Sequence, residues 1–133
     1  MVDIESQIFT ALAAEIRKKF KGAMVSGEYV AAPSKFPYVS IVEQDNYIST
    51  ENMDTSDAEE FASVLYEVNV YSNKVSGKKT ECRKIMELVD RMLYRMNFTR
   101  ISMTPVPNME NATIYRLVAR YTAKTDGNTI YRR

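Results

Sequence analysis

VYSNKVSGKKTECRKIMELVDRML, residues 70 to 93, is the stretch that decides the fold. It joins the end of a strand-like run to a turn containing Gly77, and the turn leads into an amphipathic helical pattern. The apolar side chains that fall on one helical face at three- and four-residue spacing are Cys82, Ile85, Met86, Val89, Met92, Leu93 and Met96. The stretch therefore predicts a strand, a turn and a core-facing helix, with Ser76 as the N-cap and Asn97 at the end.

The turn also resembles a phosphate-binding P-loop in its order of strand, glycine, lysine and helix. A P-loop needs a glycine five residues before the glycine of Gly-Lys-Ser/Thr, and a hydroxyl directly after the lysine. Here Ser72 takes the place of the first glycine, and Lys79 stands ahead of Thr80 where the hydroxyl is needed. We interpret the turn as an ordinary strand-to-helix connection, in which Lys78 and Lys79 are solvated or reach a partner.

Two long segments alternate with the period of a β-strand. FASVLYEVNVYS, residues 61 to 72, places Val64, Tyr66, Val68 and Val70 on one face. ATIYRLVARYTAK, residues 112 to 124, places Tyr115, Leu117, Ala119 and Tyr121 on one face and Ile114, Arg116, Val118 and Arg120 on the other. A sheet face that mixes arginine with β-branched residues is either solvated or typical of a subunit contact.

The remaining elements are shorter or lie near the N-terminus. Apolar residues recur every four positions from Ile4, which predicts a helix over residues 4 to 21 with Asp3 as its cap and Gly22 as its stop. Two short strands are expected around residues 27 to 31 and 38 to 43. A further strand, FTRISMTP, residues 98 to 105, is expected to be stopped by Pro105 and Pro107.

This order of elements predicts an α+β fold, a mainly antiparallel sheet of four to five strands with two helices packed on one face. We expect a single domain over residues 1 to 123, with a long acidic loop at 43 to 60, and a C-terminal tail over residues 124 to 133. A loop of that length inside one domain is uncommon, and it more often has a function than serves only as a connection.

The acidic loop carries four of its carboxylates close together, at Asp54, Asp57, Glu59 and Glu60. The loop contains no glycine, so it does not match a calcium-binding loop. A solvated loop or a charged protein interface fits this composition better than a metal site or an acid/base pair.

Composition excludes several kinds of chemistry. The chain has 133 residues and no histidine, so it lacks the usual zinc ligand and the base of a Ser-His-Asp triad. Its single cysteine, Cys82, cannot close an intrachain disulfide, and the helical stripe predicts that it is buried. No apolar run is long enough to span a bilayer, and Asp3 and Glu5 stand where a signal peptide would be basic. We expect a soluble protein with no cofactor, no metal and no catalytic residues.

Net charge is +1, but the charges are distributed unevenly along the chain. Residues 36 to 73 contain eight Asp or Glu and no Lys or Arg, and residues 74 to 133 contain thirteen Lys or Arg against five Asp or Glu. The two segments therefore carry −8 and +8. This asymmetry reflects solvated faces in many proteins, and it also suits a chain that binds copies of itself head to tail.

The opening stretch is similar to part of the tail-completion or tail-terminator family of long-tailed bacteriophages. In that family an N-terminal helix leads through a proline-containing strand pair, as in FPYVSIVE here, to an acidic loop and a long strand that ends like VYS. A Gly/Lys turn and an amphipathic helix follow, and the last strand reads like TIYRLVARYTAK. The resemblance covers about residues 4 to 124.

The resemblance implies a structural, non-enzymatic ring, commonly of six subunits, that caps the tail tube and docks it to the head connector. It implies a homo-oligomer that contacts the tail tube protein and the connector, while viral DNA passes through the lumen without sequence-specific binding. It places the protein in the tail-neck region of the virion, assembled in the host cytoplasm. A head-closure or neck adaptor and, from another class, a nucleotide-binding enzyme using Lys78, Lys79 and Thr80 stay open as alternatives.

The residues expected at an interface are those whose charges fit a subunit contact, namely Asp54, Asp57, Glu59, Glu60, Lys78, Lys79, Arg116 and Arg120.

Overall fold

The computed structural model describes residues 2–30, 33–48, 61–107 and 112–131. The described residues form two helices and five strands in the order α1 (Glu5–Lys19), β1 (Met24–Ser26), β2 (Tyr38–Ile48), β3 (Ala62–Ser72), α2 (Lys78–Arg95), β4 (Thr99–Pro107) and β5 (Tyr115–Thr125). The predicted order of helix, three strands, helix and two strands is confirmed.

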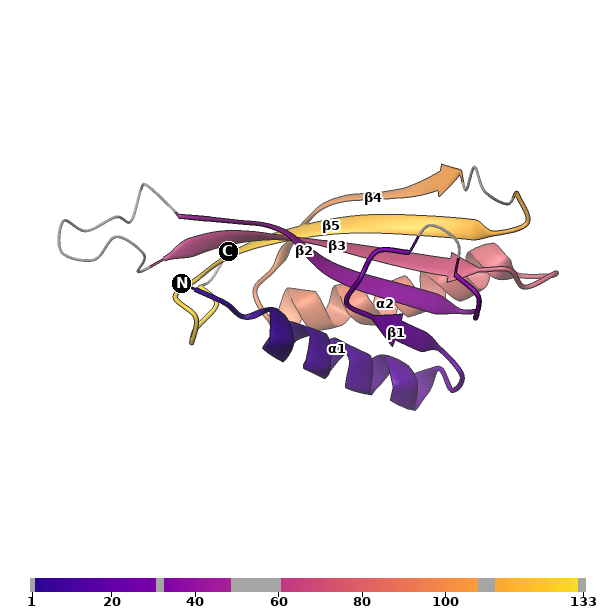
Figure 1. Ribbon diagram of the computed structural model, residues 1–133, viewed down its shortest axis with the longest axis horizontal. Helices are drawn as coiled ribbons and strands as arrows, with labels where there is room; N and C mark the ends of the chain where they lie inside the picture. The colour runs from indigo at the N-terminus through magenta and orange to yellow at the C-terminus, as the bar shows by residue number, and fades with distance from the viewer. Residues whose placement is uncertain (1, 31–32, 49–60, 108–111, 132–133) are drawn as a thin grey trace.

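The five strands form one sheet in the order β1-β2-β3-β5-β4. Every pairing is antiparallel except that of β1 with β2, which is parallel. Both helices cover one face of this sheet, as Figure 1 shows, and no helix formed by the described residues lies on the opposite face, which is called the helix-free face below. The α+β fold expected from the sequence is therefore confirmed.

The main hydrophobic core lies between the sheet and the helices. It contains the even-numbered apolar residues of β3, the odd-numbered ones of β5, and the inward stripes of α1 and α2. Met86, on the α2 stripe, is completely buried, whereas Met92, on the same stripe, is only partly buried. Neither described helix is long and apolar enough to cross a membrane.

The helix ends differ slightly from the expected positions. α1 covers Glu5 to Lys19, so it is shorter at both ends than residues 4 to 21, and Ile4 is its N-cap residue. Asp3 still supports this end, because its Oδ1 accepts a hydrogen bond from the Glu5 N–H at 3.1 Å. At the start of α2 the N-cap is Gly77, with a left-handed φ of 90°, and not Ser76 as predicted. Glycine adopts this backbone conformation without the strain a side chain would add.

Two strands have bounds that differ from the predicted ones. The strand expected over residues 27 to 31 lies earlier, at Met24 to Ser26, because these three residues pair with the start of β2. The strand expected over residues 98 to 105 begins at Thr99 and includes both prolines that were expected to stop it, ending at Pro107. β4 is the outermost strand of the sheet, and an edge strand tolerates proline because it has a neighbour on one side only.

The acidic loop and the C-terminal tail also begin later in the chain than predicted. Residues 43 to 48 belong to β2, where they pair with β3 through an irregularity between Glu43 and Asp45, so the segment was wrongly expected to be loop from residue 43. At the other end, Thr125 still lies in β5 and forms an isolated bridge with Ile130, which packs against the core. The described part of the tail therefore folds back onto the domain.

Cys82 is expected to react slowly with iodoacetamide at pH 8 in the native protein. Its side chain is completely buried, and its thiol donates to the backbone oxygen of Val70 at 3.5 Å. Burial raises the pKa of the Cys82 thiol to about 12, so the reactive thiolate is scarce at pH 8. Labelling followed by mass spectrometry should show modification only after denaturant is added, and rapid native labelling would contradict the placement of this helix face.

Candidate functional site

The polar side chains of the helix-free sheet face form the most distinctive cluster in the described chain. Val64, Tyr66, Val68 and Val70 of β3 point to the helices, so the alternate residues Glu67, Asn69 and Tyr71 point the other way. The register places Glu67 opposite Arg120 and Tyr71 opposite Arg116 on β5. The pairing of β3 with β5 thus brings both predicted arginines onto the same face.

Hydrogen bonds link four of these side chains into a chain of donors and acceptors. Arg120 Nε donates to Glu67 Oε2 at 3.1 Å, and Asn69 Nδ2 donates to Glu67 Oε1 at 2.9 Å. Asn69 Oδ1 in turn accepts from Arg116 Nε at 2.9 Å. Glu67 is only 6% exposed, and burying its charge would be costly without partners. Hydrogen bonds to both of its carboxylate oxygens offset that cost.

The same hydrogen bonds hold both guanidinium groups against the sheet. Each arginine uses its Nε atom for the inward bond, and a guanidinium has five N–H donors in all. The Arg120 side chain remains 50% exposed, although its partner Glu67 is buried. The face therefore presents arginine donors that are held in place and still accessible to an outside acceptor.

Two tyrosines hold Arg116 in addition to Asn69. The Arg116 guanidinium lies 5.3 Å from the ring centroid of Tyr29 and 5.7 Å from that of Tyr71, within the range of cation–π contacts. The Tyr71 ring is buried and meets Tyr38 edge to face. Burial raises the pKa of Tyr71 to about 12, so its hydroxyl stays neutral and adds no charge beside Arg116. Tyr29 lies on the exposed side, where it widens the accessible surface.

The two predicted lysines lie at the first turn of α2. Lys78 Nζ donates to the backbone oxygen of Thr113 at 3.2 Å, which ties the helix start to the segment before β5. Ser72, at the position of the missing P-loop glycine, donates its hydroxyl to Glu81 Oε1 at 2.7 Å. A carboxylate is therefore bonded at the turn where a P-loop would hold an anionic phosphate. Lys79 is exposed.

The structure brings Arg116 and Arg120 together but does not join them to the other predicted interface residues. Lys78 and Lys79 belong to the start of α2, and the expected acidic quartet, Asp54, Asp57, Glu59 and Glu60, lies outside the described residues. Sequence reasoning missed Glu67, Asn69 and Tyr29 as members of this face. Polar residues alternating within an apolar strand were the available signal for Glu67 and Asn69, but their partners depend on the strand register.

Within the described ranges, no group of three or more Cys, Asp or Glu side chains is placed to hold a metal ion. A scan against protein-family models and a search of curated proteins both find no match to the chain. The features that point to a function are therefore the residues of the helix-free face, the charge distribution and the resemblance described above.

Proposed function

We propose that the chain is a structural subunit of a phage-type tail, a terminator that forms a ring, caps the tail tube and docks it to the head connector. The observation that carries this proposal is the pair of anchored arginines, Arg116 and Arg120, on the helix-free face of the sheet. The partners of this ring are the tail tube protein and the head connector, and it assembles in the host cytoplasm, as the resemblance implies. Viral DNA passes through its lumen.

Anchored arginines favour a protein interface for an energetic reason. Ordering a long side chain on binding costs about 0.5 to 1.5 kcal/mol, and an arginine already held by a buried acceptor has lost much of that freedom before the partner arrives. Arginine and tyrosine are also the residue types most often found at energetic centres of interfaces. Tyr29 and Arg116 supply both types side by side.

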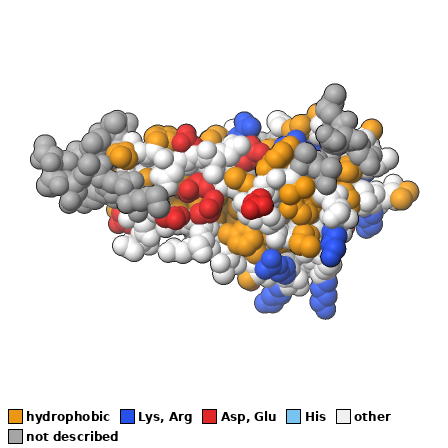
Figure 2. Space-filling view, viewed as in Figure 1, with side chains coloured by type: hydrophobic (Ala, Val, Ile, Leu, Met, Phe, Trp, Pro, Cys, Tyr) orange, Lys and Arg blue, Asp and Glu red, His pale blue; other side chains and the backbone are white. Residues whose placement is uncertain are grey.

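The distribution of charge favours a head-to-tail ring. In the view of Figure 2, acidic side chains gather near the middle of the molecule, and lysines and arginines gather toward the end where α1 finishes. The basic residues of the last turn of α1 are Arg17, Lys18 and Lys19. A contact between unlike surfaces of successive copies closes into a ring when the rotation between them is suitable.

A native mass measurement tests the proposal directly. The wild-type protein should sediment in analytical ultracentrifugation as a closed species of several subunits, six being the number that the resemblance implies, and the same mass should appear in native mass spectrometry.

Millimolar ATP with magnesium should leave its melting temperature unchanged, because the turn before α2 is occupied by the Ser72 to Glu81 bond.

A strictly monomeric protein at high concentration would contradict the ring. A saturable rise in melting temperature with ATP, abolished by Lys78→Ala together with Lys79→Ala, would favour a nucleotide-binding enzyme instead.

A further inference from the structure

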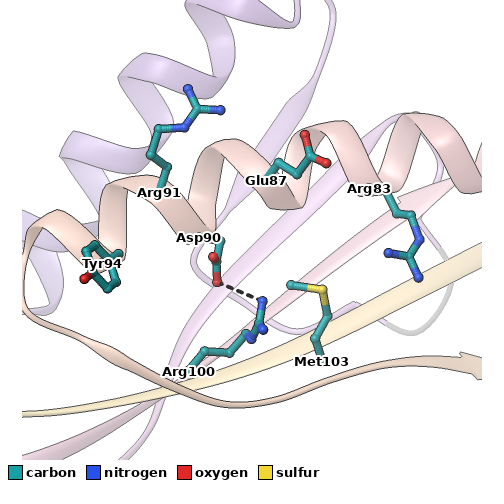
Figure 3. A pocket seen from close by; sticks show the side chains of 7 residues that line it. All are labelled: Arg83, Glu87, Asp90, Arg91, Tyr94, Arg100 and Met103. Atoms are coloured by element: carbon teal, nitrogen blue, oxygen red, sulfur yellow. Dashed lines mark hydrogen bonds and ion pairs between the residues drawn. The ribbon is translucent and has the colours of Figure 1, made fainter.

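A groove of about 520 Å³ lies between α2 and the outer strand β4, away from the helix-free face. Three arginines and two carboxylates line it together with Tyr94 and Met103, the charged residues being Arg83, Glu87, Asp90, Arg91 and Arg100. Figure 3 shows Asp90 and Arg83 extending from α2 toward β4, and Arg100 and Met103 extending from β4 toward α2.

Asp90 is fixed at the base of this groove by two neighbours. Its Oδ1 accepts from the Tyr121 hydroxyl at 2.9 Å and from Arg100 Nη1 at 3.3 Å. One carboxylate is thus already shared between a core tyrosine and a groove arginine. Arg83 extends into the same space, so the groove is suited to an additional anionic side chain.

The strand that forms one wall of the groove is open to pairing. β4 is the last strand of the sheet, so its outer edge has no strand partner among the described residues. The pairing of β4 with β5 shifts between Arg100 and Ser102, and Ile101 at that irregularity is 56% exposed. Pro105 and Pro107 lack the backbone donor that an added strand needs, which leaves residues 99 to 104 as the usable part of the edge.

We propose that residues 99 to 104 and the adjoining groove bind the acidic stretch 49 to 60 of a second copy as an added strand. This is the recognition mode in which an extended segment pairs with an exposed sheet edge while neighbouring pockets take its side chains. The inference depends on the proposed ring, and it assigns the contact between successive subunits to the β4 edge.

Charge complementarity identifies the occupant. Residues 49 to 60 contain five Asp or Glu and no Lys or Arg, a net charge of −5, whereas the groove has one more arginine than carboxylate. β2, which leads into that stretch, is separated from β4 by β3 and β5 in the sheet. A head-to-tail neighbour presents the stretch to the β4 edge without crossing those two strands.

Peptide binding tests the groove without requiring an intact ring. The receiver is the full-length chain with Asp54, Asp57, Glu59 and Glu60 replaced by lysine, so that its own stretch cannot compete. A dye-labelled peptide of residues 49 to 60 should bind saturably in fluorescence anisotropy. Arg83→Glu in the receiver should weaken binding at least about tenfold, the equivalent of a few partly exposed ion pairs.

Lys84→Glu is the matched control, because it makes the same charge change one residue along α2 and Lys84 does not line this groove. Hydrogen exchange should slow at the backbone amides of residues 99 to 104 when the peptide is bound. Equal loss of binding in both variants, unchanged exchange of these amides, or equal binding of a peptide with Asn and Gln in place of the acids would each overturn the assignment.

The possible failures are distinguishable from failure of the ring. A wild-type ring combined with no peptide binding overturns the groove and leaves the proposed function standing. A wild-type monomer that binds the peptide at β4 overturns the ring. The backbone amides of residues 99 to 104 could also exchange slowly in wild-type protein diluted to monomers. That result would mean that residues 49 to 60 of the same chain occupy the groove, and it would overturn the contact with a second copy.

Discussion

Met86→Asp should prevent the chain from folding, or lower its melting temperature by about 12 °C or more. Met86 is completely buried in the core between α2 and the sheet, and the buried members of its core cluster are all hydrophobic. Burying an unpaired charge costs at least about 4 kcal/mol, against a total stability of roughly 5 to 15 kcal/mol for a protein of this kind. Thermal unfolding followed by circular dichroism measures the loss.

Met92→Asp is the matched control on the same helix. Met92 is only partly buried and lines an open groove between α1 and α2, whose charged residues are the cations Lys19, Arg91 and Arg95 and the single carboxylate Glu15. A carboxylate there keeps contact with water and lies near three cations, so we expect a loss of about 1 to 2 kcal/mol, typical of a single substitution. Similar losses for the two variants would contradict the packing of α2.

If the chain forms the proposed ring, replacing Asp54, Asp57, Glu59 and Glu60 by lysine should shift it toward folded monomers in analytical ultracentrifugation. Exposed ion pairs are worth about 0.2 to 1 kcal/mol each, so four of them change the dissociation constant of a contact between about fourfold and several hundredfold. Raising the salt concentration should weaken the proposed ring of the unsubstituted protein in the same direction, because salt screens exposed charges.

A different outcome would locate the acidic stretch in the lumen of the ring. The lysine variant would then still form rings but would bind duplex DNA, with an affinity that falls steeply as salt rises. Intact rings with no new DNA binding would exclude both locations, and the stretch would then be a solvated loop.

Charge reversal at Arg116 and Arg120 would compensate for the lysine variant only if these two arginines were the partners of the acidic stretch. The structure gives each arginine a partner within its own chain, and Glu67 beneath Arg120 is nearly buried. Arg120→Glu would place two carboxylates together and leave Glu67 without its cation, which destabilises the monomer itself. Arg83→Glu is therefore the better compensating change, because Arg83 is exposed on α2.

The sequence determined the features that depend on local periodicity. The stripe from Cys82 to Leu93 predicted the buried face of α2, and the alternation in β3 and β5 predicted which residues share a face of the sheet. These patterns are readable because a helix repeats every 3.6 residues and a strand every two, whatever the rest of the chain does. The order of elements and the α+β class followed from them.

Only the tertiary structure decided which surfaces those elements form. Arg120 and Glu67 are 53 residues apart in sequence, and only the register of β3 with β5 places them in contact. The same holds for the open edge of β4, which follows from β5 inserting beside β3, and for the different burial of Met86 and Met92 on one stripe. Register and burial depend on long-range packing and on the depth of each position in the core, and a local pattern carries neither kind of information.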